Sequence, residues 1–345
     1  MWKLTVAILL CASVAGASEP ADPFLRDLAL TQRFELGNPT NIQPAPDGKA
    51  IFFLRAEPRS PVNSLYRFDV ATGETKKLLA PEDVLRGAEE KLSAAERQQR
   101  ERTRQSGRGF VHVQLSRDGK IVLAALSGRL FIVRLSDNDV SELKIAAQPA
   151  LNPTLSPDAT QVAFVHERDL YVYDLRTHKE RRLTKSTDPA ISNGMAEFVA
   201  EEELDRVQGF WWSPDSRQLA FEEADARGVE KLTLPDLAHP ERATEGALYP
   251  RAGKPNAKVR VGVVAVTGGA PHWLAWDADK LPYLAKVVWT DKAPLTLVLL
   301  SRDQKTTQVV AFGSKGGAGK PLVTESDTQF LELDPTVPRW LPDGS

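Results

Sequence analysis

The sequence has little cysteine, no excess of charge of one sign, and no long apolar run after its first 20 residues. It holds 345 residues with one Cys, and Lys+Arg 44 against Asp+Glu 46 give a formal charge of −2. Without a basic excess, a surface that tracks nucleic-acid phosphates is disfavoured. A bilayer-spanning helix needs about 20 apolar residues, so no membrane contact is expected once the N-terminal segment is removed. The remaining composition, 42% hydrophobic and 26% charged, is typical of a soluble globular protein.

The N-terminal segment has the organisation of a signal peptide over residues 1–17. Lys3 supplies a positive start, residues 4–14 are apolar, and residues 15–17 are small, as at a cleavage site. A buried first strand is the alternative, but the apolar run ends abruptly. We therefore expect a periplasmic or secreted protein.

The single cysteine, Cys11, lies inside this segment. A lipoprotein site would need a small residue just before the cysteine, and Leu10 is not small. The mature chain is therefore expected to have no disulfide and no thiolate metal site. Export without disulfides fits a bacterial periplasm or medium.

One turn phrase recurs after a short helical lead-in over residues 18–42. Its copies contain Asp47, Asp118, Asp158 and Asp215, and each precedes a run of strand length that is rich in apolar residues. Proline presets φ for a turn, and Asp-Gly tolerates positive φ. Each copy therefore predicts a turn between two strands.

Second hairpins follow these turns, for example from 65–69 to 77–79 and from 170–175 to 181–184. Repeats of roughly 40–50 residues with four strands each indicate a β-propeller. A β-sandwich with decorated loops is the alternative. We predict an all-β fold over residues 43–345, a β-propeller of four-stranded blades.

The longer intervals between copies predict short helical insertions near 82–104 and 196–206. Residues 337–345 form a further copy of the turn phrase without the strand that should follow. The expectation is therefore a propeller that is incomplete at its C-terminal end, as in a truncated chain.

The second insertion contains three consecutive glutamates, residues 201–203, followed by Gly-Phe-Trp at 209–211. Such a run is typical of a solvated face or an acidic helix start. Its position changes this interpretation, because binding residues concentrate on loops that a rigid scaffold holds.

Residues 193–215 resemble the double-glutamate segment of the dipeptidyl peptidase IV family of prolyl oligopeptidase-type serine peptidases, and residues 249–264 also resemble its propeller. The resemblance covers most of residues 25–345 and suggests a bacterial member. It implies an N-terminal propeller and a C-terminal α/β-hydrolase domain that together remove X-Pro or X-Ala dipeptides from free peptide N-termini. The family's pair corresponds to Glu202 and Glu203, which would hold the α-ammonium of the substrate.

Two carboxylates suit this role, because an α-ammonium has an unperturbed pKa of about 7.7–8.0 and offers three N–H donors. If the N-terminus of the substrate is held in place, only the peptide bond after its second residue can reach the nucleophile. Neighbouring residues do not share a helix face, so both glutamates can meet one ligand only on a distorted or very short helical turn.

The family also uses a propeller arginine near the substrate carbonyl. The stretch 100–104 is rich in arginine, and Arg104 is our candidate for this role. The alternative is a solvated helix with many charge pairs.

A catalytic elbow of the form G-x-S-x-G is absent from the sequence. We therefore expect no catalytic residue, and no activity from this chain alone. The glycine-rich stretch 313–320 lacks a Ser or Thr after its lysine, so a hairpin turn is expected rather than a phosphate loop. No cofactor and no metal are expected, because the histidines lack metal-site spacing: His112, His166, His178, His239 and His272.

The expected partners are peptides with a free N-terminus and Pro or Ala second, and the chain's own C-terminal hydrolase domain. Neither nucleic acid nor membrane is expected, and a homodimer stays open. Two alternatives remain: a non-catalytic periplasmic β-propeller that serves as a binding or interaction module, and an endopeptidase whose propeller only excludes large substrates.

Overall fold

The computed structural model describes residues 22–345, apart from 234–236, 238–240, 242–245, 292, 342 and 345. The expected signal peptide, residues 1–17, therefore lies outside the described residues. The lead-in contains one helix, α1 (Pro23–Leu30), which begins where the Asp22 side chain accepts the N–H of Phe24. Among the helices of the described ranges, none combines the length and the apolarity that crossing a membrane requires.

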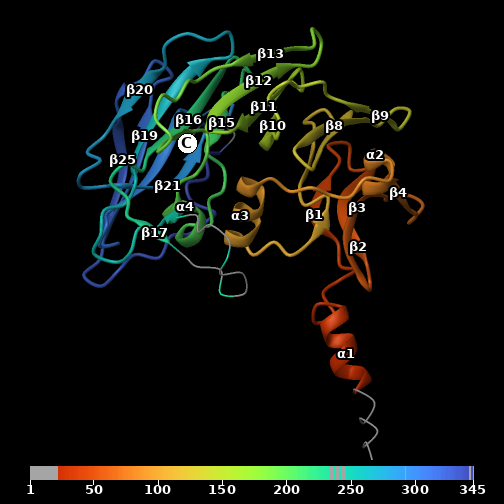
Figure 1. Ribbon diagram of the computed structural model, residues 1–345. Helices are drawn as coiled ribbons and strands as arrows, with labels where there is room; N and C mark the ends of the chain where they lie inside the picture. Colours follow the sequence, from red (N-terminus) through yellow and green to blue (C-terminus); the bar gives the residue numbers. More distant parts are fainter. Residues whose placement is uncertain are drawn as a thin grey trace, which may run out of the picture.

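Antiparallel sheets follow one another along the chain, from orange through yellow and green to blue in Figure 1. The first three are β1 (Thr40–Pro44), β2 (Ala50–Glu57), β3 (Ser60–Asp69) and β4 (Thr75–Leu79), with β5 (Arg108–Gly109) beside β3; β6 (Val113–Leu115), β7 (Ile121–Leu126), β8 (Arg129–Arg134) and β9 (Asp139–Glu142); and β10 (Leu151–Leu155), β11 (Gln161–His166), β12 (Asp169–Asp174) and β13 (Lys179–Arg182).

Two further blade-like sheets and a small arm complete the described part. They are β14 (Ile191–Asn193), β15 (Phe210–Trp212), β16 (Gln218–Asp225), β19 (Lys258–Ala265), β20 (His272–Ala275) and β24 (Gly317–Ala318); β21 (Tyr283–Val288), β22 (Leu295–Leu300), β23 (Thr306–Phe312) and β25 (Lys320–Ser326); and the arm β17 (Lys231–Thr233) with β18 (Gly246–Leu248). Residues 313–319 join β23 to its antiparallel neighbour β25, so the glycine-rich stretch is a hairpin connection.

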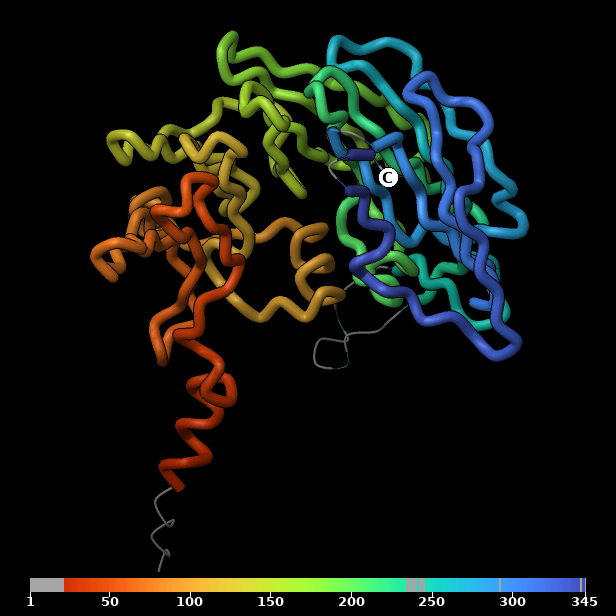
Figure 2. Tube along the Cα trace, turned by 180° about the vertical axis from the view of Figure 1, so that it is seen from behind, coloured from red at the N-terminus to blue at the C-terminus, as the bar shows by residue number. Residues whose placement is uncertain are grey.

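The core lies between consecutive sheets. Alternate residues of one central strand face opposite neighbours: Val122 packs toward the first sheet, and Leu123 packs toward the third. Phe221 packs against the third sheet in the same way, whereas Ala220 packs against the fifth. Because both faces are buried, the central strands are continuous apolar runs. This stacking confirms the predicted propeller of four-stranded blades, and the sheets do not close into a ring (Figure 2).

A Ser-x-Asp turn precedes β7, β11, β16 and β23 in four of the blades. In each turn the serine hydroxyl donates to the aspartate and accepts backbone N–H groups four and five residues on. The serines are Ser116, Ser156, Ser213 and Ser301. The turn at Ser301 is a copy that the sequence analysis did not identify, because neither Pro nor Gly accompanies its aspartate.

Both predicted helical insertions are present. The first contains α2 (Pro81–Leu85) and α3 (Ala94–Arg102), and the second contains α4 (Phe198–Glu203). The second insertion interrupts the inner strand of the fourth sheet. β14 pairs with residues 223–225 of β16, and β15 pairs with residues 219–221 of the same strand. The chain that carries α4 therefore leaves and re-enters the sheet on either side of Glu222.

Candidate functional site

The helix α4 is one short turn that projects from this interrupted strand. It begins at Glu197, whose carboxylate accepts the N–H groups of Val199 and Ala200, both at 2.8 Å. It ends where the N–H of Arg206 reaches the carbonyl of Ala200 at 2.9 Å. With six residues, α4 is a short helix of the kind that was expected for the paired glutamates.

The three consecutive glutamates of α4 have different surroundings. The side chain of Glu201 is only 2% exposed, and its Oε2 lies 2.5 Å from Nη1 of Arg102. Burial raises the pKa of Glu201, and the Arg102 guanidinium acts in the opposite direction. Glu202 and Glu203 are exposed, and within the described ranges neither carboxylate has an ion-pair or hydrogen-bond partner. They are therefore free to accept a cation.

The contact through Arg102 places α3 beside α4, although the two residues are 99 positions apart (Figures 1 and 2). The guanidinium of Arg102 also lies 5.0 Å from the ring centroid of Phe198, which is a cation–π distance. The arginine-rich insertion thus packs against the glutamate helix.

Arg104, the residue that the sequence analysis selected, follows the end of α3 with φ +53 and is exposed. Its side chain has no ion-pair or hydrogen-bond partner among the described residues. The structure therefore brings Arg102 into contact with α4 and leaves Arg104 free nearby in the chain. The sequence offered no signal to separate the two, because both lie in one charged stretch.

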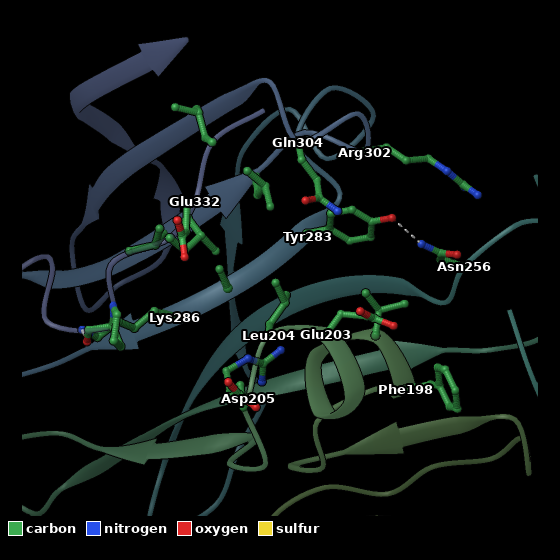
Figure 3. A pocket seen from close by; sticks show the side chains of 18 of the residues that line it. Phe198, Glu203, Leu204, Asp205, Asn256, Tyr283, Lys286, Arg302, Gln304 and Glu332 are labelled. Atoms are coloured by element: carbon green, nitrogen blue, oxygen red, sulfur yellow. Dashed lines mark hydrogen bonds between the residues drawn. The ribbon is translucent and has the colours of Figure 1, made fainter. Parts of the chain in front are cut away.

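A hollow of about 1240 Å³ lies alongside α4, and Glu203 is one of its lining residues (Figure 3). The facing wall includes Tyr283 of β21, whose hydroxyl accepts a hydrogen bond at 3.0 Å from the side chain of Asn256, which precedes β19. Lys286 and Glu332 line it further along. The hollow gives a ligand that contacts Glu203 room to extend away from α4.

An ion pair is buried at the base of α4. Nη2 of Arg206 lies 2.6 Å from Oε2 of Glu222, whose side chain is fully buried. The other carboxylate oxygen, Oε1, accepts the N–H of Glu197 at 3.0 Å. Burial raises the pKa of both Glu222 and Glu197. This pair was not predicted from the sequence, although a glutamate that follows three apolar residues of a strand was a usable signal.

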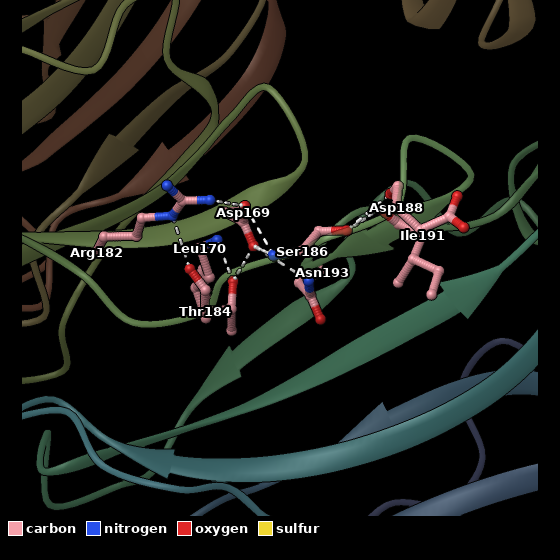
Figure 4. A network of polar contacts seen from close by, with 8 residues as sticks. All are labelled: Asp169, Leu170, Arg182, Thr184, Ser186, Asp188, Ile191 and Asn193. Carbon is pink, nitrogen blue, oxygen red and sulfur yellow. Dashed lines mark hydrogen bonds and ion pairs between the residues drawn. The ribbon is translucent and has the colours of Figure 1, made fainter.

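A second polar network holds the segment that leads into β14 (Figure 4). The buried carboxylate of Asp169 accepts hydrogen bonds from the Thr184 hydroxyl at 2.7 Å, the Ser186 N–H at 2.9 Å and the Asn193 side chain at 3.1 Å. It also pairs with Arg182 at 2.5 Å. Asp169 thereby ties the third blade to the start of the insertion.

In the described part of the chain, no three His, Cys, Asp or Glu side chains are grouped as metal ligands would be. What the site offers is two exposed carboxylates, those of Glu202 and Glu203, on a short helix that projects from the fourth sheet. Such a site suits a small cation or an amine with several N–H donors.

Comparison with known families gives one extensive match. The sequence model described as the dipeptidyl peptidase IV (DPP IV) N-terminal region matches residues 106–345. This range includes α4 and every sheet after the first.

Curated proteins show the same relationship at lower coverage. The chain is 28% identical over 190 residues to dipeptidyl peptidase 8 of Homo sapiens. This match covers 46% of this chain and 21% of that protein. It is 26% identical over 205 residues to dipeptidyl aminopeptidase B of Saccharomyces cerevisiae. This match covers 53% of this chain and 25% of that protein. The matches thus span a quarter or less of the relatives' length.

A solved structure, dipeptidyl peptidase 4 of Porphyromonas gingivalis, superposes with a TM-score of 0.68. The match covers 90% of this chain and 43% of that one at 20% sequence identity. At this identity the likeness supports the fold alone.

Proposed function

Because the chain belongs to the dipeptidyl peptidase IV N-terminal region family, we propose that it is the substrate-selecting propeller of a dipeptidyl peptidase IV-like serine exopeptidase. Such an enzyme removes X-Pro or X-Ala dipeptides from peptide N-termini. In this proposal, Glu202 and Glu203 bind the peptide's α-ammonium, and a C-terminal hydrolase domain supplies the Ser-Asp-His triad. The protein acts in the periplasm or outside the cell.

One observation carries the proposal: two adjacent carboxylates of α4 are exposed and have no ion-pair or hydrogen-bond partner among the described residues, whereas the other charged groups of this helix and its cap are paired. Glu201 is occupied by Arg102, and Glu197 by the N–H groups at the start of the helix. The free pair can accept charge-assisted hydrogen bonds from the three N–H donors of an α-ammonium. An endopeptidase has no use for such a site.

The same geometry explains how a propeller without a nucleophile could determine which bond is cut. If the N-terminus is pinned at α4, the distance from the pair to the nucleophile fixes the length of the product. The hollow beside Glu203 would then receive the first residues of the peptide. Arg104, exposed and without a partner in the described ranges, is the proposed contact to the substrate carbonyl.

The test compares free and N-acetylated Ala-Pro reporters in the peptidase that joins this chain to its hydrolase domain. Glu202→Gln and Glu203→Gln should each lower kcat/KM for the free reporter, because each removes a charge-assisted hydrogen bond. Such a bond contributes roughly 1.5–3 kcal/mol, which corresponds to about tenfold to more than a hundredfold. Glu82→Gln, an exposed position on α2, is the control and should have no effect.

The wild type should use the acetylated reporter poorly, and the two variants should lose much of this discrimination. If both variants keep the full preference for a free N-terminus, the glutamates are surface charge only. The chain would then be better described as a non-catalytic binding module.

A further inference from the structure

We propose that Arg206 and Glu222 are positioning residues for the ammonium site, and that their buried ion pair holds both ends of α4 and so fixes where Glu202 and Glu203 point. This inference rests on the proposed function for its consequence in peptide binding. Its structural part, the immobilisation of α4, stands independently of any ligand.

Glu222 occupies the only position of β16 between the residues that pair with β14 and those that pair with β15. Its backbone therefore meets the two stems of the insertion. The carbonyl of Glu222 accepts the N–H of Gly194 at 2.8 Å, and its N–H donates to the carbonyl of Gly209 at 2.8 Å. The side chain then reaches past the stems to the N–H of Glu197, the residue that caps α4.

Arg206 secures the other end of the helix. Its N–H donates to Ala200 in α4, and its Nη1 donates to the carbonyl of Gln208 in the returning stem at 2.9 Å. Its Nε donates to the carbonyl of Leu284 in the next blade at 3.0 Å. With the ion pair to Glu222, the guanidinium of Arg206 joins the returning stem to two blades, and its backbone N–H adds the contact to the helix.

The residue types fit this role. A guanidinium presents five donors in a rigid fork, whereas a lysine ammonium is a flexible point charge. A buried ion pair is weak evidence for stability, since apolar residues often replace one without loss. Its best-supported effect is on which arrangement the chain adopts, so we expect its removal to loosen α4 more than to unfold the protein.

The two stems pack too closely to adjust if the ion pair is removed. A Cβ added at Gly209 would lie 2.4 Å from the carbonyl carbon of Met195 and 2.6 Å from that of Gly194. The two stems thus pack backbone against backbone, and Met195 and Gln208 form a bridge. Small changes at this base are therefore transmitted directly to the helix above it.

The experiment measures amide hydrogen exchange in this chain at pH 8, above the pKa of about 7 to which burial raises Glu222, so that the pair is charged in the wild type. The variant is the double substitution Arg206→Met/Glu222→Gln. Glutamine keeps the volume of Glu222 and an acceptor for the N–H of Glu197. We expect exchange across residues 196–209 to become at least tenfold faster, while exchange in β10–β13 stays unchanged. The matched control, Arg129→Met/Glu142→Gln, removes an ion pair of the second blade and should leave 196–209 unaffected.

A second measurement connects α4 to binding. In the peptidase with its hydrolase domain, the double variant should raise KM for the free Ala-Pro reporter about tenfold and change kcat much less. A structural defect alone would lower the amount of active enzyme without changing KM. If the double variant fails to fold, the single variant Glu222→Gln is used in both measurements.

Unchanged amide exchange in residues 196–209 would overturn the inference, whatever the KM for the Ala-Pro reporter. Faster exchange with an unchanged KM would overturn the positioning role, provided that Glu202→Gln and Glu203→Gln weaken binding. If those two variants have no effect, the proposed function has failed instead, and the exchange result still decides whether the pair holds α4.

Discussion

The buried carboxyl of Glu222 should make the stability of this protein depend on pH in a way that one substitution removes. Its side chain is fully buried, and burial raises its pKa from 4.5 to about 7. Two charged groups face it: Arg206 lowers the pKa, and Glu197 raises it. Glu222→Gln replaces the titrating group with a neutral side chain of the same size.

Because the pKa of Glu222 is higher in the folded protein than in the unfolded chain, the stability should fall as pH rises. Between about pH 4.5 and pH 7 the folded protein keeps a proton on Glu222 that the unfolded chain has released. The stability that this group contributes is therefore fully present below about pH 4.5 and is lost as pH rises through about 7. A pKa difference of about 2.5 corresponds to about 3 kcal/mol, at roughly 1.4 kcal/mol for each unit.

The assay is urea unfolding of the wild type and of Glu222→Gln at a series of pH values from 4 to 8. Groups common to both proteins largely cancel in the difference between the two free energies of unfolding. We expect the wild type to lose about 3 kcal/mol relative to the variant as pH rises from about 4.5 to 8, following its pKa. Glu223→Gln, the neighbouring strand position that faces Arg260, is the control and should show no such trend.

A difference that stays flat over this range, or one that increases with pH, would refute the reasoning. Either result would mean that the Arg206 charge outweighs the cost of burial, so that Glu222 is ionised throughout. The control guards against a general effect of removing one negative charge from β16.

Three further predictions concern the same region. Glu201→Gln should lower the midpoint of thermal unfolding by several degrees, since it breaks a buried charge-assisted bond of roughly 1.5–3 kcal/mol; Glu202→Gln should leave the midpoint unchanged, and equal midpoints would contradict the assigned burial. Gly209→Ala should cost about 1–3 kcal/mol in chemical unfolding because its Cβ would overlap backbone atoms, whereas Gly228→Ala, with open space around it, should not. The isolated chain should hydrolyse no Gly-Pro or Ala-Pro reporter, and turnover that a serine-directed inhibitor abolishes would show this to be wrong.

The fold could be predicted because each repeat begins with a turn whose hydrogen bonds are made by residues close together in the sequence. In the copies at Asp118, Asp158 and Asp215, a serine two residues earlier satisfies the backbone of the turn. The strand that follows must be apolar on both faces, because sheets pack against each side of it. The copy at Ser301 was not predicted because the turns were identified by Pro and Gly, which favour the backbone angles of a turn. The hydrogen bonds of the turn are formed by Ser and Asp, and these two residues are present at Ser301.

The site could be predicted only in part, because its geometry depends on contacts that are distant in sequence. The short helix and the glutamate run were visible in residues 196–206. The burial of Glu201 was not, because it requires Arg102, 99 positions earlier. The role of Glu222 was equally hidden, since it follows from the interrupted strand rather than from any motif.

The three glutamates of α4 differ in their surroundings, and only Glu201 is buried. Glu201 points into the protein and uses its charge to hold α3 through Arg102. That contact brings the arginine-rich end of α3 toward the helix that carries the exposed glutamates. Glu202 and Glu203, the next two residues of α4, are exposed. The buried Glu201 thus accounts for the position of α3 beside α4, next to the helix that presents Glu202 and Glu203 at the surface.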